Sequence, residues 1–326
     1  MNKKEILFLW DGENWNPNGD MLKDNDPRRD ELSDIAEVTD VRIKRTIRDE
    51  LLKSEPESIF VKEYQFDGNV LDAKNAIRQS IDVTKSEAEI KKAVLEKFLD
   101  VRAFGAVIPI SGKNEKKASG GDSDEEPEIT DAKSHKSKKK QKVVSDVNFT
   151  GPVQFRMTKS LHKVEMEFIK GTGGFASGDD KGNKTFREES VLKYAMLATY
   201  GIIDNYNATK TGFDETDEVK ILKALWHGTK NLTTRSKIGQ MPRFMLIVTY
   251  KDDTFAGDLN NSIKVVSDKE EQAIRNLRDF KIDFTHLKNK LAKYTNNIEK
   301  IEYVSDYDFD QINQADYESS WKKIEV

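Results

Sequence analysis

The stretch EILFLW at residues 5–10 decides the fold, because every position after the first is apolar. Apolar side chains on both sides of a strand are typical of a strand covered on both faces, and six residues are too few for a helix to be preferred. The sequence therefore predicts a central strand close to residue 1. A polar loop follows, with NPNGD at 16–20 as its turn signal.

The segment TDVRIKRTIRDELLK carries the second strong pattern. Ile43, Ile47 and Leu51 repeat every four residues, so they form one apolar stripe along a helix. Thr39 or Asp40 can cap the start of this helix, because their side-chain oxygens accept hydrogen bonds from free backbone N–H groups.

Weaker patterns of the same kinds predict the remaining elements. In order, they are a strand at 58–66, a helix at 86–100, strands at 101–110, 151–160 and 162–171, a strand or helix at 191–203, a helix at 214–231, a strand at 243–250 and a helical C-terminal extension at 251–326. The order strand, helix, strand, helix, strand in the first third predicts an α+β, ferredoxin-like sheet.

Composition limits the chemistry. The chain has 326 residues, a length that fits one elaborated domain, 1–326. Charged residues make up 34% of it, and the formal net charge is −4. A nucleic-acid site must therefore be a local basic face. The sequence has no Cys and four His, which excludes disulfides, thiolate zinc sites and cysteine catalysis. No apolar run reaches the roughly 20 residues of a membrane span. We expect a cytoplasmic protein without metal or cofactor.

Residues 112–147 differ in composition from the rest of the chain. The first part is acidic, the second part is rich in lysine, and apolar side chains are almost absent. Such a segment cannot bury enough surface to become ordered, which predicts a disordered, charged insertion loop. Either a solvated spacer or an arm that touches RNA fits this composition, and the residues alone favour the spacer.

Three cations share a restricted arc of the helix that begins at Thr39. At 100° per residue, Lys44, Arg48 and Arg45 lie roughly 100°, 140° and 200° around the axis from Ile43. Cations held on a rigid element suit a phosphodiester backbone. The alternative is an ordinary solvated face with i,i+4 ion pairs, and this helix by itself favours the alternative.

Two polar loops are further candidates. The loop NLTTRSKIGQMPR at 231–243 places hydrogen-bond donors just before a buried strand. Such donors suit the phosphate or 2′-hydroxyl groups of a nucleic acid. The alternative is a generic surface loop. The N-terminal loop is rich in carboxylates, which suit Mg²⁺ and phosphodiester cleavage but also build turns, and the turn interpretation is favoured. These carboxylates are Asp11, Glu13, Asp20, Asp24, Asp26 and Asp30.

Six segments, taken in order, resemble the Cas-seven family, the repeated backbone subunit of type I CRISPR Cascade complexes, and most closely its type I-B branch. They are LFLWDGENWNPNGD at 7–20, DPRRDEL at 26–32, VTDVRIKRTIRDEL at 38–51, DVRAFGAVIP at 100–109, TGPVQFRMTKSL at 150–161 and TTRSKIGQMPRFMLIVTY at 233–250. The resemblance extends to about residue 250, with the lysine-rich insertion as a gap, and it favours a strand at 191–203.

The resemblance implies a modified RRM-like palm with helical insertions and a thumb hairpin, here at 168–187, with Phe175 as the apolar wedge. It implies a scaffold and not an enzyme: copies polymerise head to tail along the crRNA spacer, beside other Cascade subunits, and the guide bases pair with target DNA. The aromatic pattern of ordinary RRMs is absent, so base stacking on the sheet face is not expected.

The matching motifs also nominate RNA-binding residues in this chain. They are Thr39, Lys44, Arg45, Arg48, Arg102, Gln154, Arg156, Ser160, Arg235, Ser236 and Lys237, together with Phe175. We therefore expect a crRNA-binding backbone subunit. The alternatives are a metal-dependent ribonuclease that uses the N-terminal loop carboxylates, and an assembly factor that binds only protein.

Overall fold

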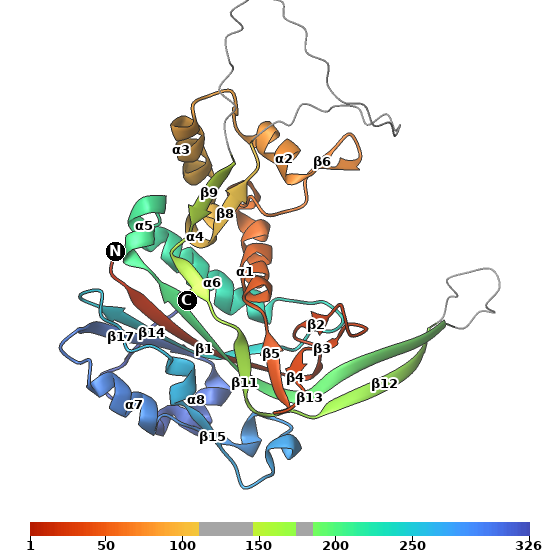
Figure 1. Cartoon of the computed structure of the whole chain (residues 1–326). Helices are drawn as coiled ribbons and strands as arrows, with labels where there is room; N and C mark the ends of the chain where they lie inside the picture. The colour runs from red at the N-terminus through yellow and green to blue at the C-terminus, as the bar shows by residue number, and fades with distance from the viewer. Residues whose placement is uncertain (111–145, 174–184) are drawn as a thin grey trace, which may run out of the picture. The chain divides into compact units, whose positions relative to one another are not determined.

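The computed structural model describes residues 1–110, 146–173 and 185–326 (Figure 1). Phe175 and nearly all of the predicted insertion at 112–147 therefore lie outside the described residues. Where we expected one elaborated domain, the chain divides into two compact units. The first unit comprises Met1–Lys62, Leu95–Ala106 and Phe149–Val326, and the second comprises Glu63–Val94 and Val107–Asn148.

A large mixed sheet forms the centre of the first unit. Among the described residues it has ten strands in the order β18-β17-β14-β1-β13-β11-β5-β4, with β10 and β12 paired to other parts of β13. The strands are β1 (Lys4–Trp15), β4 (Arg29–Asp30), β5 (Ile35–Val38), β10 (Val153–Phe155), β11 (Thr158–Lys163), β12 (Met166–Gly173), β13 (Thr185–Ile203), β14 (Met241–Tyr250), β17 (Ile298–Ser305) and β18 (Lys322–Lys323).

Strand β1 lies in the middle of the sheet, as its apolar run predicts. It is antiparallel to both neighbours, so that Ile6 faces Gly201 of β13 on one side and Ile247 of β14 on the other. Because side chains alternate along a strand, Ile6 and Phe8 enter one core and Leu7 enters the opposite core. The prediction of a central strand covered on both faces is confirmed.

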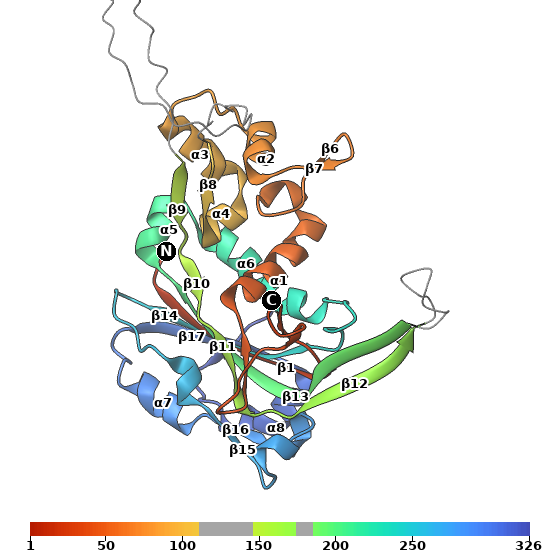
Figure 2. The same cartoon turned by 45° about the vertical axis from the view of Figure 1, so that its right-hand side comes forward.

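Helices cover the two faces of this sheet in two layers (Figure 2). One face carries α1 (Asp40–Ser54), α4 (Leu99–Phe104) and α6 (Glu215–Lys230), and the other carries α7 (Thr285–Ala292) and α8 (Tyr307–Asn313). The predicted stripe of α1 is buried, with Ile43, Ile47 and Leu51 each at most 5% exposed. The helices predicted from 39 and from 214 are thus confirmed.

Three segments differ from the predictions. Residues 101–110 are the end of α4 followed by β8 (Gly105–Ile108), and the predicted strand at 58–66 is largely loop, with η1 (Pro56–Ser58) at its start and β6 (Gln65–Phe66) at its end. The chain turns at Gly105, whose φ of 78° ends α4 and whose missing Cβ leaves room for the Phe149 carbonyl. The segment 251–326 is not a helical extension, because strands alternate with its helices.

The remaining elements are short. In the first unit they are β2 (Gly19–Asp20), β3 (Asp26–Pro27), α5 (Asn205–Thr211), η2 (Leu259–Ser262), β15 (Lys264–Val266), η3 (Glu271–Ala273), η4 (Leu277–Asp279), β16 (Lys281–Asp283) and η5 (Gln314–Asp316). The second unit holds β7 (Asn69–Val70), which pairs with β6, and α2 (Ala73–Ser80). It also holds most of α3 (Glu87–Lys97), which is the observed form of the helix predicted at 86–100, and the start of β9 (Val147–Thr150).

Candidate nucleic-acid interface

Helix α1 is fixed at its start by a polar cap. Thr39 Oγ1 accepts a hydrogen bond from the Arg42 N–H at 3.3 Å, which is the capping role the sequence predicts. The Thr39 N–H and hydroxyl both donate to Asn18 Oδ1 at 2.9 Å. Thr39 therefore joins α1 to the polar loop that follows β1.

Lys44 and Gln154 meet on the surface beside α1. Lys44 Nζ donates to Gln154 Oε1 at 2.9 Å and to Asp40 Oδ2 at 3.1 Å. The Gln154 amide in turn donates to the carbonyl oxygens of Gly151 at 2.9 Å and of Phe104 at 3.3 Å. The structure thus brings together two nominated residues that are far apart in the sequence, and holds both by further contacts.

Arg45 and Arg48 of the same helix have different surroundings. Arg45 has a side chain that is 67% exposed and pairs with Asp49 at 2.6 Å, an i,i+4 pair. Arg48 is buried, and its Nε donates to Asp100 Oδ2 at 2.8 Å. Asp100 is fully buried and also accepts from the Phe60 N–H at 2.7 Å. The geometry of Arg48 therefore suits support of the fold more than contact with a phosphate.

The loop after α6 contributes Ser236 and Lys237 next to α1. The Ser236 carbonyl accepts from the Asn16 N–H at 2.8 Å, and Lys237 Nζ donates to Ser236 Oγ at 3.2 Å. Burial lowers the pKa of the Lys237 ammonium below its ordinary value, and the positive charge of Arg42 lowers it further. Arg42 is a cation that the sequence motifs did not nominate.

The other nominated residues have partners of their own. Arg102 is held by Asp217 through two hydrogen bonds of 2.7 and 2.8 Å, which raise the pKa of its guanidinium. Ser160 is buried and accepts from the Ala36 N–H at 2.9 Å. The exposed Arg156 pairs with Asp258, and Arg235 pairs with Glu189 at 2.5 Å.

Strands β12 and β13 form a long hairpin where the thumb was predicted. Their register runs from Met166 opposite Leu192 to Gly173 opposite Thr185. Phe168 on β12 is 61% exposed, an unusual position for an aromatic side chain. It was not nominated, because only its exposure in the folded hairpin distinguishes it from a core residue.

A comparison with known proteins decides the family. The model of the family "CRISPR-associated protein Cas7" matches residues 2–285 of this chain. The chain belongs to the Cas7 family. A CRISPR-associated protein Cas7 of Haloferax volcanii is 29% identical over 316 residues, covering 94% of this chain and 87% of that protein. The resemblance to the Cas-seven family stated from the sequence motifs is thereby confirmed.

A solved structure shares the fold of this Cas7-family chain. One chain of a "CRISPR RNA-guided surveillance complex, pre-nicking" superposes with a TM-score of 0.53, covering 99% of this chain and 96% of that chain. The sequence identity is 11%, so this likeness shows the fold alone.

Asp11 and Asp20, two carboxylates of the N-terminal segment, are engaged by the protein in this Cas7-family chain. Asp11 is buried in β1, where it accepts from Arg243 Nε at 2.7 Å and from the Tyr194 hydroxyl at 2.8 Å. Asp20 accepts from the Leu22 N–H at 3.1 Å and so builds a turn. Within the described residues, no group of three or more His, Asp or Glu side chains is arranged to hold a metal ion. The ribonuclease alternative gains no support.

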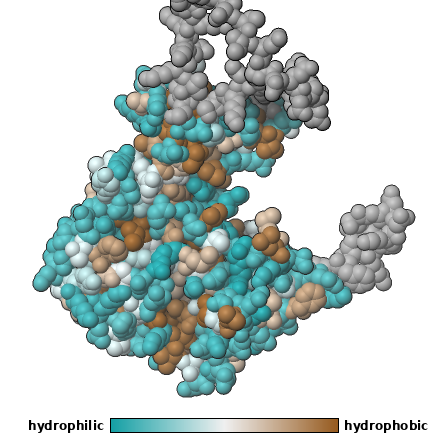
Figure 3. Space-filling model, viewed as in Figure 1, coloured by the Kyte–Doolittle hydropathy of each residue, from teal (hydrophilic) through white to brown (hydrophobic). Residues whose placement is uncertain are grey.

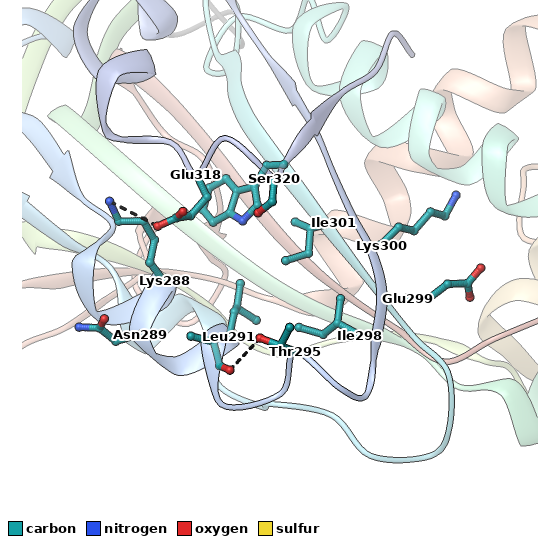
Figure 4. A pocket seen from close by; sticks show the side chains of 12 residues that line it. Lys288, Asn289, Leu291, Thr295, Ile298, Glu299, Lys300, Ile301, Glu318 and Ser320 are labelled. Carbon is teal, nitrogen blue, oxygen red and sulfur yellow. Dashed lines mark hydrogen bonds and ion pairs between the residues drawn. The ribbon is translucent and has the colours of Figure 1, made fainter.

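One cavity of about 440 Å³ lies on the other side of the sheet (Figure 4). Leu291, Ile298 and Ile301 line its apolar part, and Lys288 and Glu318 pair at 4.0 Å at its side. None of the nominated residues lines this cavity. Among the described helices, none has the length and apolar character needed to cross a membrane.

Proposed function

We propose that this Cas7-family chain is a backbone subunit of a type I CRISPR Cascade effector, closest to type I-B, that binds crRNA through its sugar–phosphate chain. The observation that carries the proposal is the α1 surface, where Lys44 and Arg45 stand on a rigid helix beside Gln154 and the loop with Lys237. Membership of the Cas7 family supports it, as does the fold shared with a chain of an RNA-guided surveillance complex.

The chemistry of this surface fits an RNA backbone. Arg45 is exposed and held by an i,i+4 pair, which in water contributes little, so a phosphate competes readily for its guanidinium. Gln154 supplies amide groups of the kind that contact phosphate and ribose without reading sequence. In this proposal the sheet and α1 act as an RRM-like palm and the β12–β13 hairpin acts as a thumb, leaving guide bases free to pair with target DNA in the cytoplasm. No catalytic step is assigned to the chain.

Two turns after β1 support a role in assembly with further copies of the chain. Met21, Leu22 and Leu32 are more than 90% exposed, yet their turns are held by hydrogen bonds to Asp20 and Asp30. An ion pair from Lys23 to Glu31 ties one turn to the other. Contiguous exposed apolar surface marks protein interaction sites, and we assign these three side chains to a contact with the next copy along the RNA. In Figure 3 the apolar patches on the visible face are small and separate.

Binding of single-stranded RNA tests the proposed function. The variant Lys44→Gln/Arg45→Gln should bind a crRNA-like oligonucleotide more weakly, and the affinity should fall equally for unrelated sequences. The slope of log affinity against log salt should flatten by roughly 0.7 for each phosphate that the variant no longer neutralises. Lys53→Gln, on the same helix, is the matched control. A wild-type protein that binds no RNA, or a double variant with the affinity and slope of wild type, contradicts the proposal.

Sedimentation of the RNA-bound protein tests the assembly role. Leu22→Ser/Leu32→Ser should occupy a long oligonucleotide as separate subunits, whereas wild type should form contiguous arrays with cooperative binding. Val219→Ser, which replaces a half-exposed apolar residue on α6, is the control. Arrays of unchanged length in the double variant would show that these turns make no contact between copies.

A further inference from the structure

The described part of the β12–β13 hairpin leaves the sheet without a third strand beside it (Figure 1). Strand β13 pairs with β1 as far as Leu192, which lies opposite Trp15. From there back to Thr185 it pairs only with β12, among the strands that the structure describes. A two-stranded ribbon by itself is marginally stable in water. The direction of the hairpin relative to the sheet therefore depends on what contacts its base.

Residues 270–275, a loop that includes η3, contact the bend where β11 ends and β12 begins. Glu271 Oε2 accepts a hydrogen bond from the N–H of Lys163, the last residue of β11, at 2.8 Å. Arg275 forms an ion pair with Glu165, which immediately precedes β12. One short segment thus holds the chain on both sides of the bend.

A third contact joins the same segment to the neighbouring strand. Gln272 Nε2 donates to Asp34 Oδ2 at 3.1 Å, and the Asp34 carbonyl accepts from the Val164 N–H at 2.8 Å. Asp34 immediately precedes β5, which pairs with β11. The three contacts therefore tie residues 270–275 both to the bend and to the strand beside it.

The segment that makes these contacts is anchored in the fold. Ile274 and Leu277 are 1% and 6% exposed and belong to the core covered by α7 and α8. Asp279 Oδ2 accepts from the Arg275 N–H at 2.7 Å and from the Asn276 N–H at 3.3 Å, so its carboxylate closes the turn between them. A segment anchored in this way holds its contacts at a fixed place relative to the core.

The start of β12 is not packed tightly against this segment. A hollow of about 600 Å³ lies at the base of the hairpin, and Val164, Met166 and Ala273 line its apolar part. Further along β12, Phe168 is 61% exposed. Because side chains do not fill the hollow, the polar contacts carry the connection between the segment and the hairpin.

We propose that residues 270–275 form a brace that fixes the direction of the β12–β13 hairpin relative to the sheet. Each exposed contact by itself contributes little in water, but three contacts from one anchored segment restrict the same bend together. The proposal rests on the function proposed above and deepens it, since a hairpin that acts as a thumb spaces successive copies evenly only if it is held at one angle. Glu271, Gln272 and Arg275 are positioning residues, because they act through the hairpin and not by contact with RNA.

Distances between two spin labels test the brace without RNA. The sequence has no Cys, so labels attach only at introduced positions, here Lys170→Cys on β12 and Lys223→Cys on α6. In an otherwise wild-type chain the distribution of label distances should be narrow. Glu165→Ala/Gln272→Ala, which removes two of the contacts and keeps the buried side chains of the segment, should broaden or shift the distribution while the melting temperature stays close to that of wild type.

Arg278→Ala, at an exposed position of the adjoining η4, is the matched control and should leave the distribution narrow. A wild-type distribution in Glu165→Ala/Gln272→Ala overturns the brace. A broadened distribution that comes with a clearly lower melting temperature also overturns it, because the contacts then serve general stability and not the direction of the hairpin.

The spacing of copies on RNA gives the second readout. On a long single-stranded oligonucleotide of mixed sequence, wild type should protect a regular pattern of positions from nuclease. Glu165→Ala/Gln272→Ala should bind with an affinity close to that of wild type but lose the regular pattern, and a pattern equal to that of wild type contradicts the role in spacing. Wild-type protein that binds no RNA contradicts the proposed function alone, because the label distances are measured without RNA.

Discussion

Arg48 and Asp100 show how a residue nominated for RNA can instead serve the fold. The pair is buried, at 2.8 Å, and Asp100 also accepts from the backbone N–H groups of Phe60 and Val61. Replacing Arg48 by Ala leaves a buried carboxylate without its counter-charge, which costs about 3–5 kcal/mol. We expect urea unfolding of Arg48→Ala to show a decrease in stability of this size.

Arg45→Ala is the matched control for this prediction, since Arg45 lies on the same helix in an exposed pair. Its unfolding free energy should stay close to that of wild type. If Arg48→Ala keeps wild-type stability while RNA affinity falls, the structural interpretation of Arg48 is wrong and the nomination from sequence motifs stands.

His162 should make stability depend on pH. It is 1% exposed, its Nε2 accepts from the Met196 N–H at 3.2 Å, and its Nδ1 therefore donates to the Lys163 carbonyl at 2.8 Å. Burial lowers the pKa of His162 below 6.5. As pH falls below about 6.5, His162 binds a proton in the unfolded chain but stays neutral in the folded protein. The free energy of unfolding therefore decreases as the pH falls.

The pH effect is isolated by comparison with His162→Gln. Gln cannot titrate, so the unfolding free energy of wild type should fall more steeply than that of the variant between about pH 7.5 and about pH 5.5. Equal slopes for the two proteins would mean that His162 takes up its proton without disturbing the fold.

At the scale of elements, the contact between α1 and α6 depends on a missing side chain. Ala is a better helix former than Gly by about 1 kcal/mol. At Gly228, however, a Cβ would approach the Thr46 carbonyl at 2.8 Å, and backbone atoms must then shift. We expect Gly228→Ala to be destabilised by about 1–3 kcal/mol in chemical unfolding, because overpacking outweighs propensity.

The exposed substitution Lys223→Ala in the same helix serves as control and should change stability little. Gly228 packs against Thr46, and its own residue carries no charge, so Gly228→Ala should weaken RNA binding only by displacing α1. An increase in stability, as propensity alone predicts, would refute the close packing of the two helices.

The elements that the sequence predicted well are those with an uninterrupted apolar pattern. The stripe of Ile43, Ile47 and Leu51 and the uniform run at 5–10 are each buried as a set, so local periodicity reports tertiary packing directly. Residues 101–104 were predicted wrongly as a strand, because Val101 and Phe104 favour a strand. The helix there depends on Asp100, whose partners Arg48 and Phe60 come from other parts of the chain.

The site was predictable to the extent that its residues lie on one element. Lys44 and Arg45 were nominated by the family motifs, since the helix by itself favoured a solvated face, and the contact of Lys44 with Gln154 joins two of those motifs. Arg42 was missed because nothing in its own helix distinguishes it from a solvated cation. Arg42 interacts with the positive charge of Lys237 only because the packing of α6 brings the loop that follows it against α1.

At the scale of the molecule, the two cores share one strand and should unfold together. Phe8 belongs to the core under α1 and α6, and Leu9 belongs to the core under α7 and α8. Phe8→Ala and Leu9→Ala should each cost about 2–5 kcal/mol and should lower the same transition. The four Trp residues all lie in the first unit, so their fluorescence reports its unfolding.

Coincident unfolding midpoints for Trp fluorescence and for far-ultraviolet circular dichroism would fit a single cooperative step. If Leu9→Ala created an early transition that left the environment of Trp226 intact, the two layers would unfold separately. The environment of Trp226 is a fair reporter of the α6 layer, since its ring lies 6.3 Å from that of Phe8.

The central position of β1 also has a consequence for biosynthesis. Its hydrogen-bonding neighbours are 185–203 and 241–250, so an apolar strand made at the start has no native partner until most of the chain has left the ribosome. At roughly 5–20 residues per second the wait is on the order of ten seconds or more. During that time the nascent strand is a target for chaperones, and slowing translation early in the message would lengthen its exposure.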